Sequence, residues 1–398
     1  MKKHISILTI VLLSSFLALS SCNKTPNKNS NSTFSINENY VEDDLPSPTG
    51  IIVSESEVEQ GDYDFHTPLQ AAYLASSYDK ISSFAKGNKE LNKPYPISFK
   101  APNDATTCRV YETNNKKYHA DVTFRDEDDA QYVDVINLKA DTNYTVEFND
   151  ANKTKTTFKT DNCLPRNVYI DGVKNVRDIG GYTSKLGGKI RQGLYYRGGR
   201  FNYSDEKTTI DEPSTFKNEL TEDGYETAVN TLKLKSEVDL RMNESHFRTT
   251  YAHEYGMMDN NSYPDIEYVP FPLDWNYSNM MKDEKETIGN IFKFLANEEN
   301  YPVYVHCNIG TDRTGMITYL LGSLLGIPQI DLYYDYLFSN FANINGSRDL
   351  TKITNLYQKT LLEYQNFNIY YDTRDYLKDC GVSDEEMNKI HRIFIETI

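Results

Sequence analysis

The chain has 398 residues, of which 38% are hydrophobic and 25% are charged, a composition typical of a folded protein long enough for more than one domain. Its 58 acidic and 42 basic side chains give a net charge of −16. A protein with this charge repels the phosphate backbone of nucleic acids at long range, so the balance argues against a nucleic-acid partner.

The first residues have the layout of a secretory signal. Two lysines precede an apolar run from Ile5 to about Leu19, which is too short to span a membrane, and small residues follow before Cys22. The stretch LSSC resembles a bacterial lipobox, which implies a signal peptide over residues 1–21 and a lipid on Cys22; ordinary cleavage near Cys22 is the alternative. We therefore expect an extracytoplasmic lipoprotein anchored to a bacterial membrane.

Two segments of different character follow. Residues 22–50 are polar and nearly free of aliphatic side chains, so they cannot bury enough surface to fold, and we expect a flexible tether. Residues 51–90 include helical spacing through Leu69, Tyr73 and Leu74, which predicts a helical segment whose role the sequence leaves open.

Residues 91–162 consist of short alternating runs separated by turn residues, such as CRVYET, HADVTF and NYTVEF. Period-two alternation of this kind predicts a small all-β sandwich. The stretch LKADTNYTVEF resembles the end of a fibronectin type III domain, and the resemblance places Leu138 and Tyr144 where that family fastens one corner of its sandwich. We expect this domain to act in spacing or docking, because no catalytic cluster lies within it.

Strand and helix patterns alternate over residues 163–398, which predicts an α/β domain with a mostly parallel central sheet flanked by helices. The predicted strands are SEVDLRM, IEYVPFPL and YPVYVHC. A helix with one apolar face from Ile288 onward separates the last two. An almost wholly apolar helix follows the third strand and ends near Gly326, and Ser383 with Glu386 forms the capping box of a last helix.

The stretch VHCNIGTDRTGM lies between the third strand and the apolar helix. Five residues separate Cys307 from Arg313, a span that lets one turn hold both side chains around one anion. Backbone N–H groups of such a turn have no helical partners, and with the helix N-terminus they form an anion-binding nest. Gly310 permits the tight turn, and the planar guanidinium matches two phosphate oxygens. The predicted phosphate-binding residues are Asn308, Ile309, Gly310, Thr311, Asp312, Arg313 and Thr314.

Cys307 is the predicted nucleophile. A site that stabilises anions lowers the pKa of a thiol, and the thiolate is the reactive form. We expect its sulfur to attack phosphorus and give a cysteinyl-phosphate that water releases, with Thr314 donating to the sulfur or to the phosphate. No metal or other cofactor is required, because Arg313 and the amides supply the electrostatic stabilisation. The alternative is a buried cysteine and a surface arginine without shared chemistry.

The full pattern HC-x-x-G-x-x-R-T-G resembles the signature of the protein tyrosine phosphatase superfamily. The blocks NVRDIGGY, GLYYRGGRF, EVDLRMNES, HCNIGTDRTG and YDYLFSN occur in this order. They resemble a bacterial tyrosine phosphatase family whose loop commonly has HC-x-x-G-K-D-R-T-G. The resemblance covers residues 164–398 and implies activity on phosphotyrosine, with some members also acting on phosphoserine or phosphoinositides. Thr311 stands where that family usually has lysine, which speaks against phosphoinositides.

Two aspartates compete for the role of general acid, which protonates the leaving oxygen. Superfamily phosphatases carry this aspartate on a loop before the cysteine, and Asp274 in FPLDWN occupies such a place, directly after a predicted strand. Asp312 is the rival, because the matching aspartate of the resembling family is a proposed acid or water-orienting group. A neighbouring phosphate dianion would raise its pKa. The sequence leaves the choice open, and both can serve, one in each step.

Other polar residues are expected to support the loop. These supporting residues are His306, Asn175, Arg177, Asp178, Asp239 and Arg241. We expect His306 to brace the loop by a hydrogen bond and Asp239 to fix a strand end. We expect Asn175, Arg177 and Asp178 to join the edge of the domain to the loop. A basic segment either steers anionic substrates or is a solvated face, and it contains Lys189, Arg191, Arg197 and Arg200.

The predicted function is a cysteine-dependent phosphomonoester hydrolase, a protein tyrosine phosphatase or dual-specificity phosphatase acting on a phosphorylated protein or a small phosphate ester. Two alternatives remain: hydrolysis of inositol phosphates or phosphoinositides, and a non-catalytic surface protein that binds phosphorylated ligands. Cys108, Cys163 and Cys380 allow at most one disulfide, and the sequence does not decide whether one forms.

Overall fold

The computed structural model describes residues 51–53, 62–77, 80, 93–116, 118–127, 129–204, 216–241, 266–274, 279–342, 344 and 346–396. The predicted signal peptide, the predicted lipid site Cys22 and the predicted tether lie outside these residues. Among the helices of the described residues, none combines the length and the apolar character that crossing a membrane requires.

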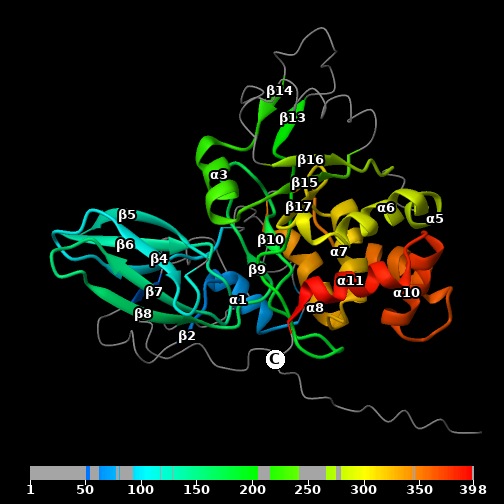
Figure 1. Ribbon diagram of the computed structural model, residues 1–398, viewed down its shortest axis with the longest axis horizontal. Coiled ribbons are helices and arrows are strands. Elements are labelled where there is room, and N and C mark those ends of the chain that lie inside the picture. The colour runs from blue at the N-terminus through cyan, green and yellow to red at the C-terminus, as the bar shows by residue number, and fades with distance from the viewer. Residues whose placement is uncertain are drawn as a thin grey trace, which may run out of the picture. The chain divides into compact units, whose positions relative to one another are not determined.

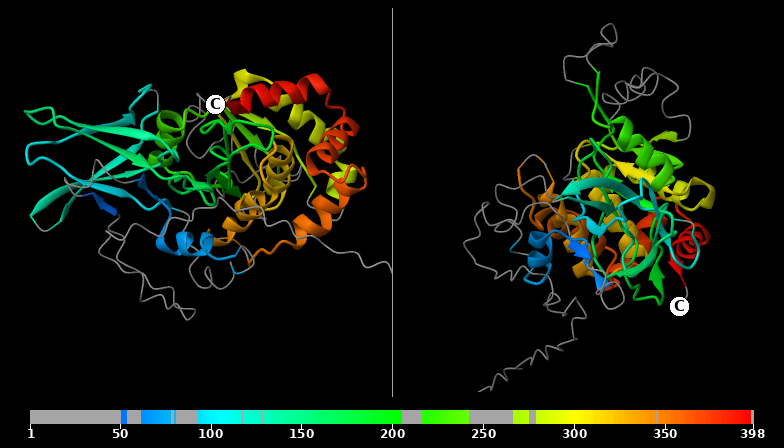
Figure 2. Two further views of the ribbon diagram at one scale, coloured as in Figure 1. Left: turned by 90° about the horizontal axis from the view of Figure 1, so that it is seen from below. Right: turned by 90° about the vertical axis from the view of Figure 1, so that its left-hand side faces the viewer.

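Two four-stranded sheets form the first part of the described chain, and Figure 2 shows their strands from two directions. One sheet has the order β1 (Ile51–Val53), β3 (Ile97–Lys100), β6 (Ala130–Ile136), β5 (Asp121–Glu127). The other has the order β2 (Asp62–Tyr63), β8 (Lys155–Thr160), β7 (Asn143–Phe148), β4 (Cys108–Glu112). The pairs β1–β3 and β2–β8 are parallel, and the other pairs are antiparallel.

The two sheets share one apolar core. Val133 and Val135, which lie two residues apart on β6, are fully buried in this core, and so is Val146 of β7. This follows from the alternation of side chains along a strand, which sends every second residue to the same face. At one corner the hydroxyl of Tyr144 accepts a hydrogen bond from the backbone N–H of Lys139 at 2.7 Å.

Only some of the described residues in the segment 51–90 are helical, which corrects the sequence prediction for those residues. Helix α1 (Pro68–Leu74) forms where helical spacing was expected, and Thr67 caps it in a capping box with Gln70. The strands β1 and β2, however, come before this helix and pair with β3 and β8. Their partners lie far along the chain, and local periodicity carries no information about such pairing.

A six-stranded sheet organises the second part of the chain. Its order is β16 (Glu267–Pro270), β15 (Ser236–Asp239), β17 (Val303–His306), β12 (Tyr195–Gly198), β10 (Arg177–Asp178), β9 (Arg166–Asn167). The first four strands are mutually parallel, and β10 and β9 are antiparallel to their neighbours. The mostly parallel sheet expected from the sequence is therefore present, and the motif follows one of its central strands.

Helices cover both faces of this sheet. In β17, Val303 and Val305 belong to one buried cluster, whereas Tyr304 belongs to another, because successive side chains point to opposite faces. The first face is covered by α6 (Lys285–Leu295) and α7 (Arg313–Leu324). The second is covered by α3 (Glu222–Glu226) and the π-helical turn Thr227–Thr231.

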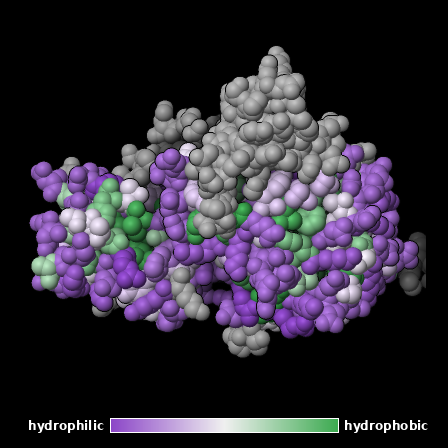
Figure 3. All heavy atoms as spheres, turned by 45° about the horizontal axis from the view of Figure 1, so that its top comes forward, coloured by the Kyte–Doolittle hydropathy of each residue, from purple (hydrophilic) through white to green (hydrophobic). Residues whose placement is uncertain are grey.

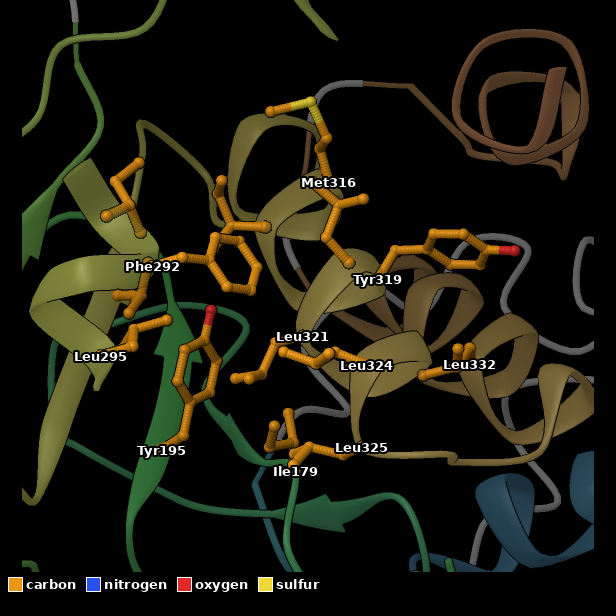
Figure 4. Close-up of a cluster of buried hydrophobic side chains, with 14 of the residues drawn as sticks. Ile179, Tyr195, Phe292, Leu295, Met316, Tyr319, Leu321, Leu324, Leu325 and Leu332 are labelled. Atoms are coloured by element: carbon orange, nitrogen blue, oxygen red, sulfur yellow. The ribbon is translucent and has the colours of Figure 1, made fainter. Parts of the chain in front are cut away.

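Figure 4 shows part of the first cluster, in which Phe292 of α6 and Leu321 and Leu324 of α7 surround Tyr195 of β12. Fully burying one such apolar side chain contributes roughly 1.5–3 kcal/mol. Every residue of α7 is buried, which explains why the sequence is apolar all around this helix. A helix enclosed on all sides holds its first residue, Arg313, in a fixed position.

The remaining helices complete the domain. They are α5 (Met280–Asp283), α8 (Gln329–Leu337), α9 (Lys359–Leu362), α10 (Ile369–Asp379) and α11 (Asp384–Phe394), with short turns at Glu298–Asn300, Phe338–Phe341 and Ile353–Gln358. In Figure 1, α10 and α11 lie beside α6. The predicted capping box of Ser383 and Glu386 opens α11. Two short pairs, β11 (Lys189–Ile190) with β18 (Ile395–Glu396) and β13 (Asn202–Ser204) with β14 (Phe216–Asn218), lie apart from the main sheet.

On the face of the molecule that Figure 3 shows, hydrophilic side chains cover most of the described surface. Large hydrophobic side chains that are exposed are few among the described residues: Leu186, Leu362, Phe367 and Tyr371. This hydrophilic surface agrees with the net charge of −16 of the sequence.

Candidate active site

The loop between β17 and α7 is held from outside by two buried side chains. The amide nitrogen of Asn175 donates to the carbonyl oxygen of Ile309 at 2.9 Å. The guanidinium of Arg197 donates to the carbonyl oxygens of Gly310 at 2.7 Å and Thr311 at 3.3 Å. The carbonyl groups of the loop thus point toward the protein, which turns the backbone N–H groups the other way.

The N–H groups of residues 308–313 are available to a ligand, since none of them donates a hydrogen bond to a described protein atom. Gly310 makes the turn possible. Its φ is +68°, and a Cβ there would lie 2.1 Å from the carbonyl oxygen of Gly198. Consecutive free amides at the start of a helix are the geometry in which proteins bind phosphate through the backbone.

Cys307 lies at the end of β17 with 3% of its surface exposed. Burial raises the pKa of its thiol, but the guanidinium of Arg313 and the hydroxyl and backbone N–H of Thr314 outweigh burial, so the pKa lies below its ordinary value. The sulfur is therefore favoured as a thiolate, the nucleophilic form.

Arg313 begins α7 and carries a buried charge. One terminal nitrogen donates to the carbonyl oxygens of Leu240 at 3.1 Å and Leu273 at 3.2 Å. Its Nε is buried without a hydrogen-bond partner, and within the described part of the chain it has no carboxylate in ion-pair range. A buried charge without a counter-ion is unfavourable, so this guanidinium and the free amides together define an anion site.

Asp274 follows directly after Leu273, whose carbonyl Arg313 binds, and this bond holds the start of the Asp274 loop beside the phosphate loop. The backbone N–H of Asp274 donates to the carboxylate of Glu284 at 3.3 Å. Its side chain is partly exposed. The residues that follow, 275–278, lie outside the described residues.

Asp312 has a different environment from the one predicted. Its carboxylate accepts hydrogen bonds from Arg348 at 3.1 Å and from Tyr336 at 3.0 Å, and it lies 2.8 Å from the Lys352 ammonium. Burial raises the pKa of this carboxyl, but the hydrogen bonds and charges of Arg348 and Lys352 lower it further, and the net shift is downward. The raised pKa was expected for a carboxyl beside a bound phosphate dianion, whereas the protein groups alone, above all Arg348 and Lys352, shift the pKa of Asp312 downward.

His306 braces the loop from the second face of the sheet. Its Nε2 lies 2.8 Å from a carboxylate oxygen of Glu237, and its Nδ1 lies 3.1 Å from the carbonyl oxygen of Cys307. Burial lowers the pKa of His306, while the charges of Asp239 and Glu237 raise it more. Asp239 also holds Arg241 through both carboxylate oxygens, at 2.7 to 2.9 Å, at the end of β15.

Asp335 is a supporting residue that the sequence analysis missed. It accepts a hydrogen bond from Arg177 at 3.1 Å and pairs with Arg197, so it joins the two arginines under the loop. Ser339 receives hydrogen bonds from Asn175 at 3.2 Å and Arg177 at 3.3 Å. Both acceptors lie in the YDYLFSN block that carried part of the resemblance, which was the available signal.

Asp178 does not reach the loop. Its carboxylate pairs with Arg166 and accepts hydrogen bonds from the backbone N–H groups of Gly180 at 2.8 Å and Gly193 at 2.6 Å. The expectation that Asp178 joins the domain edge to the loop is therefore wrong. Its neighbour in sequence, Arg177, points to the opposite side of the short strand β10, as alternation requires.

The basic segment does not line the anion site as a group. Lys189 pairs with Asp141, and Arg191 donates to the carbonyl oxygens of Arg392 and Ile393. Arg197 is buried beneath the loop. Of the two alternatives that the sequence left open, these contacts argue against the one in which the segment lines the anion site and steers substrates.

The structure also answers whether a disulfide forms among Cys108, Cys163 and Cys380. Cys108, Cys163, Cys307 and Cys380 are all free thiols. Cys163 follows β8, and its sulfur is 3.7 Å from the carbonyl oxygen of Tyr63.

Comparison with known proteins agrees with this site. The sequence profile described as "Tyrosine phosphatase family" matches residues 168–396. A tyrosine-protein phosphatase of Nostoc commune is 30% identical over 70 residues, which are 18% of this chain and 24% of the relative. A probable tyrosine-protein phosphatase of Dictyostelium discoideum is 26% identical over 107 residues, 26% of this chain and 60% of the relative. The chain thus matches less than two thirds of the length of these relatives.

Two solved structures are also similar to parts of the chain. The core catalytic domain of the PP-IP phosphatase SIW14 from S. cerevisiae has a TM-score of 0.27 and 17% identity, covering 44% of this chain and 88% of that one. TpbA from P. aeruginosa has a TM-score of 0.24 and 11% identity, covering 50% of this chain and 85% of that one. The family profile matches more than half of the residues, and on that basis this chain belongs to the tyrosine phosphatase family.

Proposed function

We propose that this chain is a cysteine-dependent phosphomonoester hydrolase that acts on phosphotyrosyl groups. The observation that carries the proposal is the buried Arg313, which has no described carboxylate in range and lies beside the Cys307 thiol with its lowered pKa. Together with the free amides of residues 308–313, it provides a site for a dianion next to a nucleophile. Membership of the tyrosine phosphatase family supports the same chemistry.

In the first step, the phosphate of the substrate binds to the amides and to the guanidinium of Arg313. The Cys307 thiolate uses an electron pair to form an S–P bond, and the bond between phosphorus and the leaving oxygen breaks. The leaving oxygen takes a proton from the carboxylic acid of Asp274 and departs as a phenol or alcohol. The developing charge on the phosphoryl oxygens is stabilised by groups that are already in place.

In the second step, water attacks the cysteinyl-phosphate. The Asp274 carboxylate accepts a proton from that water, the S–P bond breaks, and inorganic phosphate leaves with the Cys307 thiolate restored. Atoms and charges balance over the two steps, with no oxidant, reductant or metal ion taking part.

We assign the acid to Asp274 rather than to Asp312. Arg348 and Lys352 hold Asp312 in its charged form and lower its pKa, which makes it a poor proton donor near neutral pH. Asp274 is partly exposed on a segment tied to Arg313 through Leu273. Asp312 then acts as a positioning residue, since its carboxylate links the loop to Tyr336 on α8 and to two cations.

The preference for phosphotyrosine rests on the loop residue Thr311. Its side chain carries a neutral hydroxyl, which accepts a hydrogen bond from Asn175 at 3.2 Å, where a lysine would add a positive charge to the anion site. Highly phosphorylated headgroups need several cations, whereas one phosphotyrosyl group needs only the loop and Arg313.

A substrate panel tests this proposal. The full-length chain should hydrolyse p-nitrophenyl phosphate and a phosphotyrosyl peptide in the presence of a metal chelator, faster than a phosphoseryl peptide or inositol phosphates. Faster hydrolysis of inositol phosphates would replace the phosphotyrosine assignment with the alternative substrate class.

The variant Cys307→Ser tests whether the chain is an enzyme at all. Its turnover should fall by about 10³-fold or more, because a serine hydroxyl at this position is not ionised near neutral pH, while phosphate or vanadate binding should persist. Unchanged turnover would rule out this thiol as the nucleophile. Binding without turnover in the parent chain would indicate a surface protein that captures phosphorylated ligands.

We also propose that Cys22 carries a lipid that anchors the chain outside the cytoplasm. The lysines, apolar run and LSSC stretch at the N-terminus support this proposal. A test is membrane fractionation of the parent and of Cys22→Ala: loss of membrane association and of labelled fatty acid is expected for the variant, and retention of both would contradict the anchor.

For residues 91–162 we propose a fibronectin type III-like spacer. The support is the contact at its corner, where the Tyr144 hydroxyl accepts a hydrogen bond from the Lys139 N–H and Leu138 is buried beside it. Tyr144→Phe removes only that hydroxyl, so unfolding in urea should show a loss of about 1 kcal/mol. No loss would argue against a fastened corner.

A further inference from the structure

A second cluster of chemically active side chains lies away from the phosphate loop. Asp64 and His66 follow strand β2, and Cys163 follows β8, the strand with which β2 pairs. One ligand atom of each of the three residues lies within 4.8 Å of the others. The Nδ1 of His66 is 3.1 Å from a carboxylate oxygen of Asp64. None of these residues takes part in the site described above.

The three donor types are those that zinc prefers, namely a thiolate sulfur, an imidazole nitrogen and a carboxylate oxygen. The second ring nitrogen of His66 supports this role. Its Nε2 donates to the carbonyl oxygen of Pro165 at 2.9 Å, which leaves Nδ1 as the ring atom that faces the cluster. Nδ1 lies 3.1 Å from the Asp64 carboxylate and carries a proton in that pair, so an ion that binds Nδ1 replaces this proton. A histidine that binds a metal commonly donates its other N–H to a carbonyl in this way.

The cluster is enclosed on one side and open on the other. Cys163 and His66 are 2% and 4% exposed, whereas the side chain of Asp64 is 42% exposed. A buried thiol and imidazole restrict the geometry of binding, and the exposed carboxylate leaves a route by which an ion can enter from solvent.

We propose that Asp64, His66 and Cys163 bind one divalent ion of the zinc class, with water as the remaining ligand. The Cys163 thiol and the Nδ1–H of His66 each release a proton to solvent when the ion binds, because sulfur and nitrogen both bind a metal in their deprotonated forms. The ion would join the chain after β2 to the chain after β8. Its role is structural, because the phosphoryl transfer proposed for Cys307 uses no metal.

The position of the cluster indicates which part of the protein a bound ion would stabilise. The ring of His66 packs against Phe338 with 5.8 Å between ring centroids. The next residue, Ser339, accepts hydrogen bonds from Asn175 and Arg177, which support the phosphate loop. An ion on His66 therefore stabilises the chain on which that support is built.

Cobalt binding tests the proposal. The full-length chain with Cys307→Ser, which removes the competing reactive thiol, is stripped with a chelator and titrated with Co²⁺. One equivalent should bind and produce the absorption band of a thiolate–cobalt bond. Adding Cys163→Ser, a substitution close in shape, should abolish the band, whereas adding Cys380→Ser, at another buried thiol, should leave it unchanged.

A second variant keeps the test decisive if Cys163→Ser folds poorly. Asp64→Asn changes a partly exposed side chain and should weaken Zn²⁺ binding by at least about tenfold, since even outer-shell changes cost about 10–100-fold. Zn²⁺ should also raise the melting temperature of the parent chain and raise that of Asp64→Asn less at the same concentration. Absence of saturable binding, or a band that survives Cys163→Ser, would overturn the proposal. Phosphatase activity of the parent in chelator is measured separately, so failure here leaves the proposed enzyme untouched.

Discussion

Two buried thiols of this chain have opposite surroundings. Cys307 lies beside a guanidinium and free amides, and Arg313 with Thr314 lowers its pKa despite burial. Cys163 lies beside Asp64, and burial together with that negative charge raises its pKa well above its ordinary value. Both side chains are almost fully buried, with 3% and 2% exposed. Burial alone therefore does not set reactivity; the sign of the neighbouring charge does.

The comparison assigns the two regions different chemistry. At the phosphate loop, positive groups stabilise a thiolate that is ready to attack an electrophile. At the Asp64 cluster, the thiol keeps its proton until a cation replaces it, which suits a ligand and not a nucleophile. The experiments below change one region at a time, in order of the expected effect.

The largest effect is expected from Arg313→Lys. Lysine keeps the positive charge but loses the planar pair of donors, so kcat/KM toward p-nitrophenyl phosphate should fall by about 10²–10³-fold. The matched control is Arg191→Lys, at an exposed arginine that bonds only to carbonyl oxygens of the C-terminal segment in the described structure, and it should retain parental activity. Equal activities for the two variants would mean that no anion depends on Arg313.

The second-largest effect distinguishes Asp274 from Asp312 as the general acid. Asp274→Asn should slow hydrolysis of alkyl phosphates by about 10²-fold or more and affect p-nitrophenyl phosphate less, because a good leaving group needs no proton. Asp312→Asn should change both substrates to the same extent, as expected for a positioning residue. The exposed Asp283→Asn serves as control. If Asp312→Asn shows the leaving-group dependence instead, the acid has been assigned to the wrong residue.

Alkylation compares the thiols directly. Since the pKa of Cys307 is lowered, its thiolate persists as the pH falls below the ordinary thiol value of about 8.5. Burial raises the pKa of Cys108 and Cys380 to about 11, so these thiols stay protonated up to that pH. Iodoacetamide at pH 7 should label Cys307 at least about tenfold faster, as followed by peptide mass spectrometry. Inorganic phosphate should protect it, and unprotected or uniform labelling would contradict the comparison.

The smallest effect concerns the ion pair that holds Asp312. The pKa of Asp312 is lowered in the folded protein. The stability that its ion pair contributes is therefore present above the unfolded-state pKa of about 3.9 and is lost as pH falls through the folded-state pKa. Lys352→Met should therefore cost about 0.5–1 kcal/mol in urea unfolding at pH 7 and less at pH 3, because the pair is partly exposed. Lys359→Met, at an exposed lysine of α9, is the control; an equal loss at both pH values would exclude the ion pair as the cause.

Much of the loop was predictable because its chemistry is local. The spacing of Cys307, Gly310 and Arg313 between an apolar strand and an apolar helix predicts a phosphate-binding turn, and the free amides and the φ of +68° at Gly310 are found there. Strand β17 and helices α7 and α11 follow from periodicity and capping for the same reason, since neighbours in sequence set those signals.

Partners that are distant in sequence were not predictable. Asp335 on α8 pairs with Arg177 and Arg197. Arg348 and Lys352, which precede the turn Ile353–Gln358, pair with Asp312. Arg348 and Lys352 lower the pKa of Asp312, an effect that spacing along the chain did not indicate. Asp178 and Arg177 are separated because they lie on opposite sides of the short strand β10. Charge pairs depend on which side chains folding brings together, and spacing along the chain does not record this.

The sequence by itself indicated the family and the turn that holds the proposed nucleophile, because a strand, a turn and a helix contiguous in the chain place these groups whatever surrounds them. Only the tertiary structure decided which carboxylates are neutralised, that strands β1 and β2 complete two sheets, and that Asp64 and His66 meet Cys163. Those outcomes depend on long-range packing, in which the energy of a side chain is set by neighbours that the linear order does not specify.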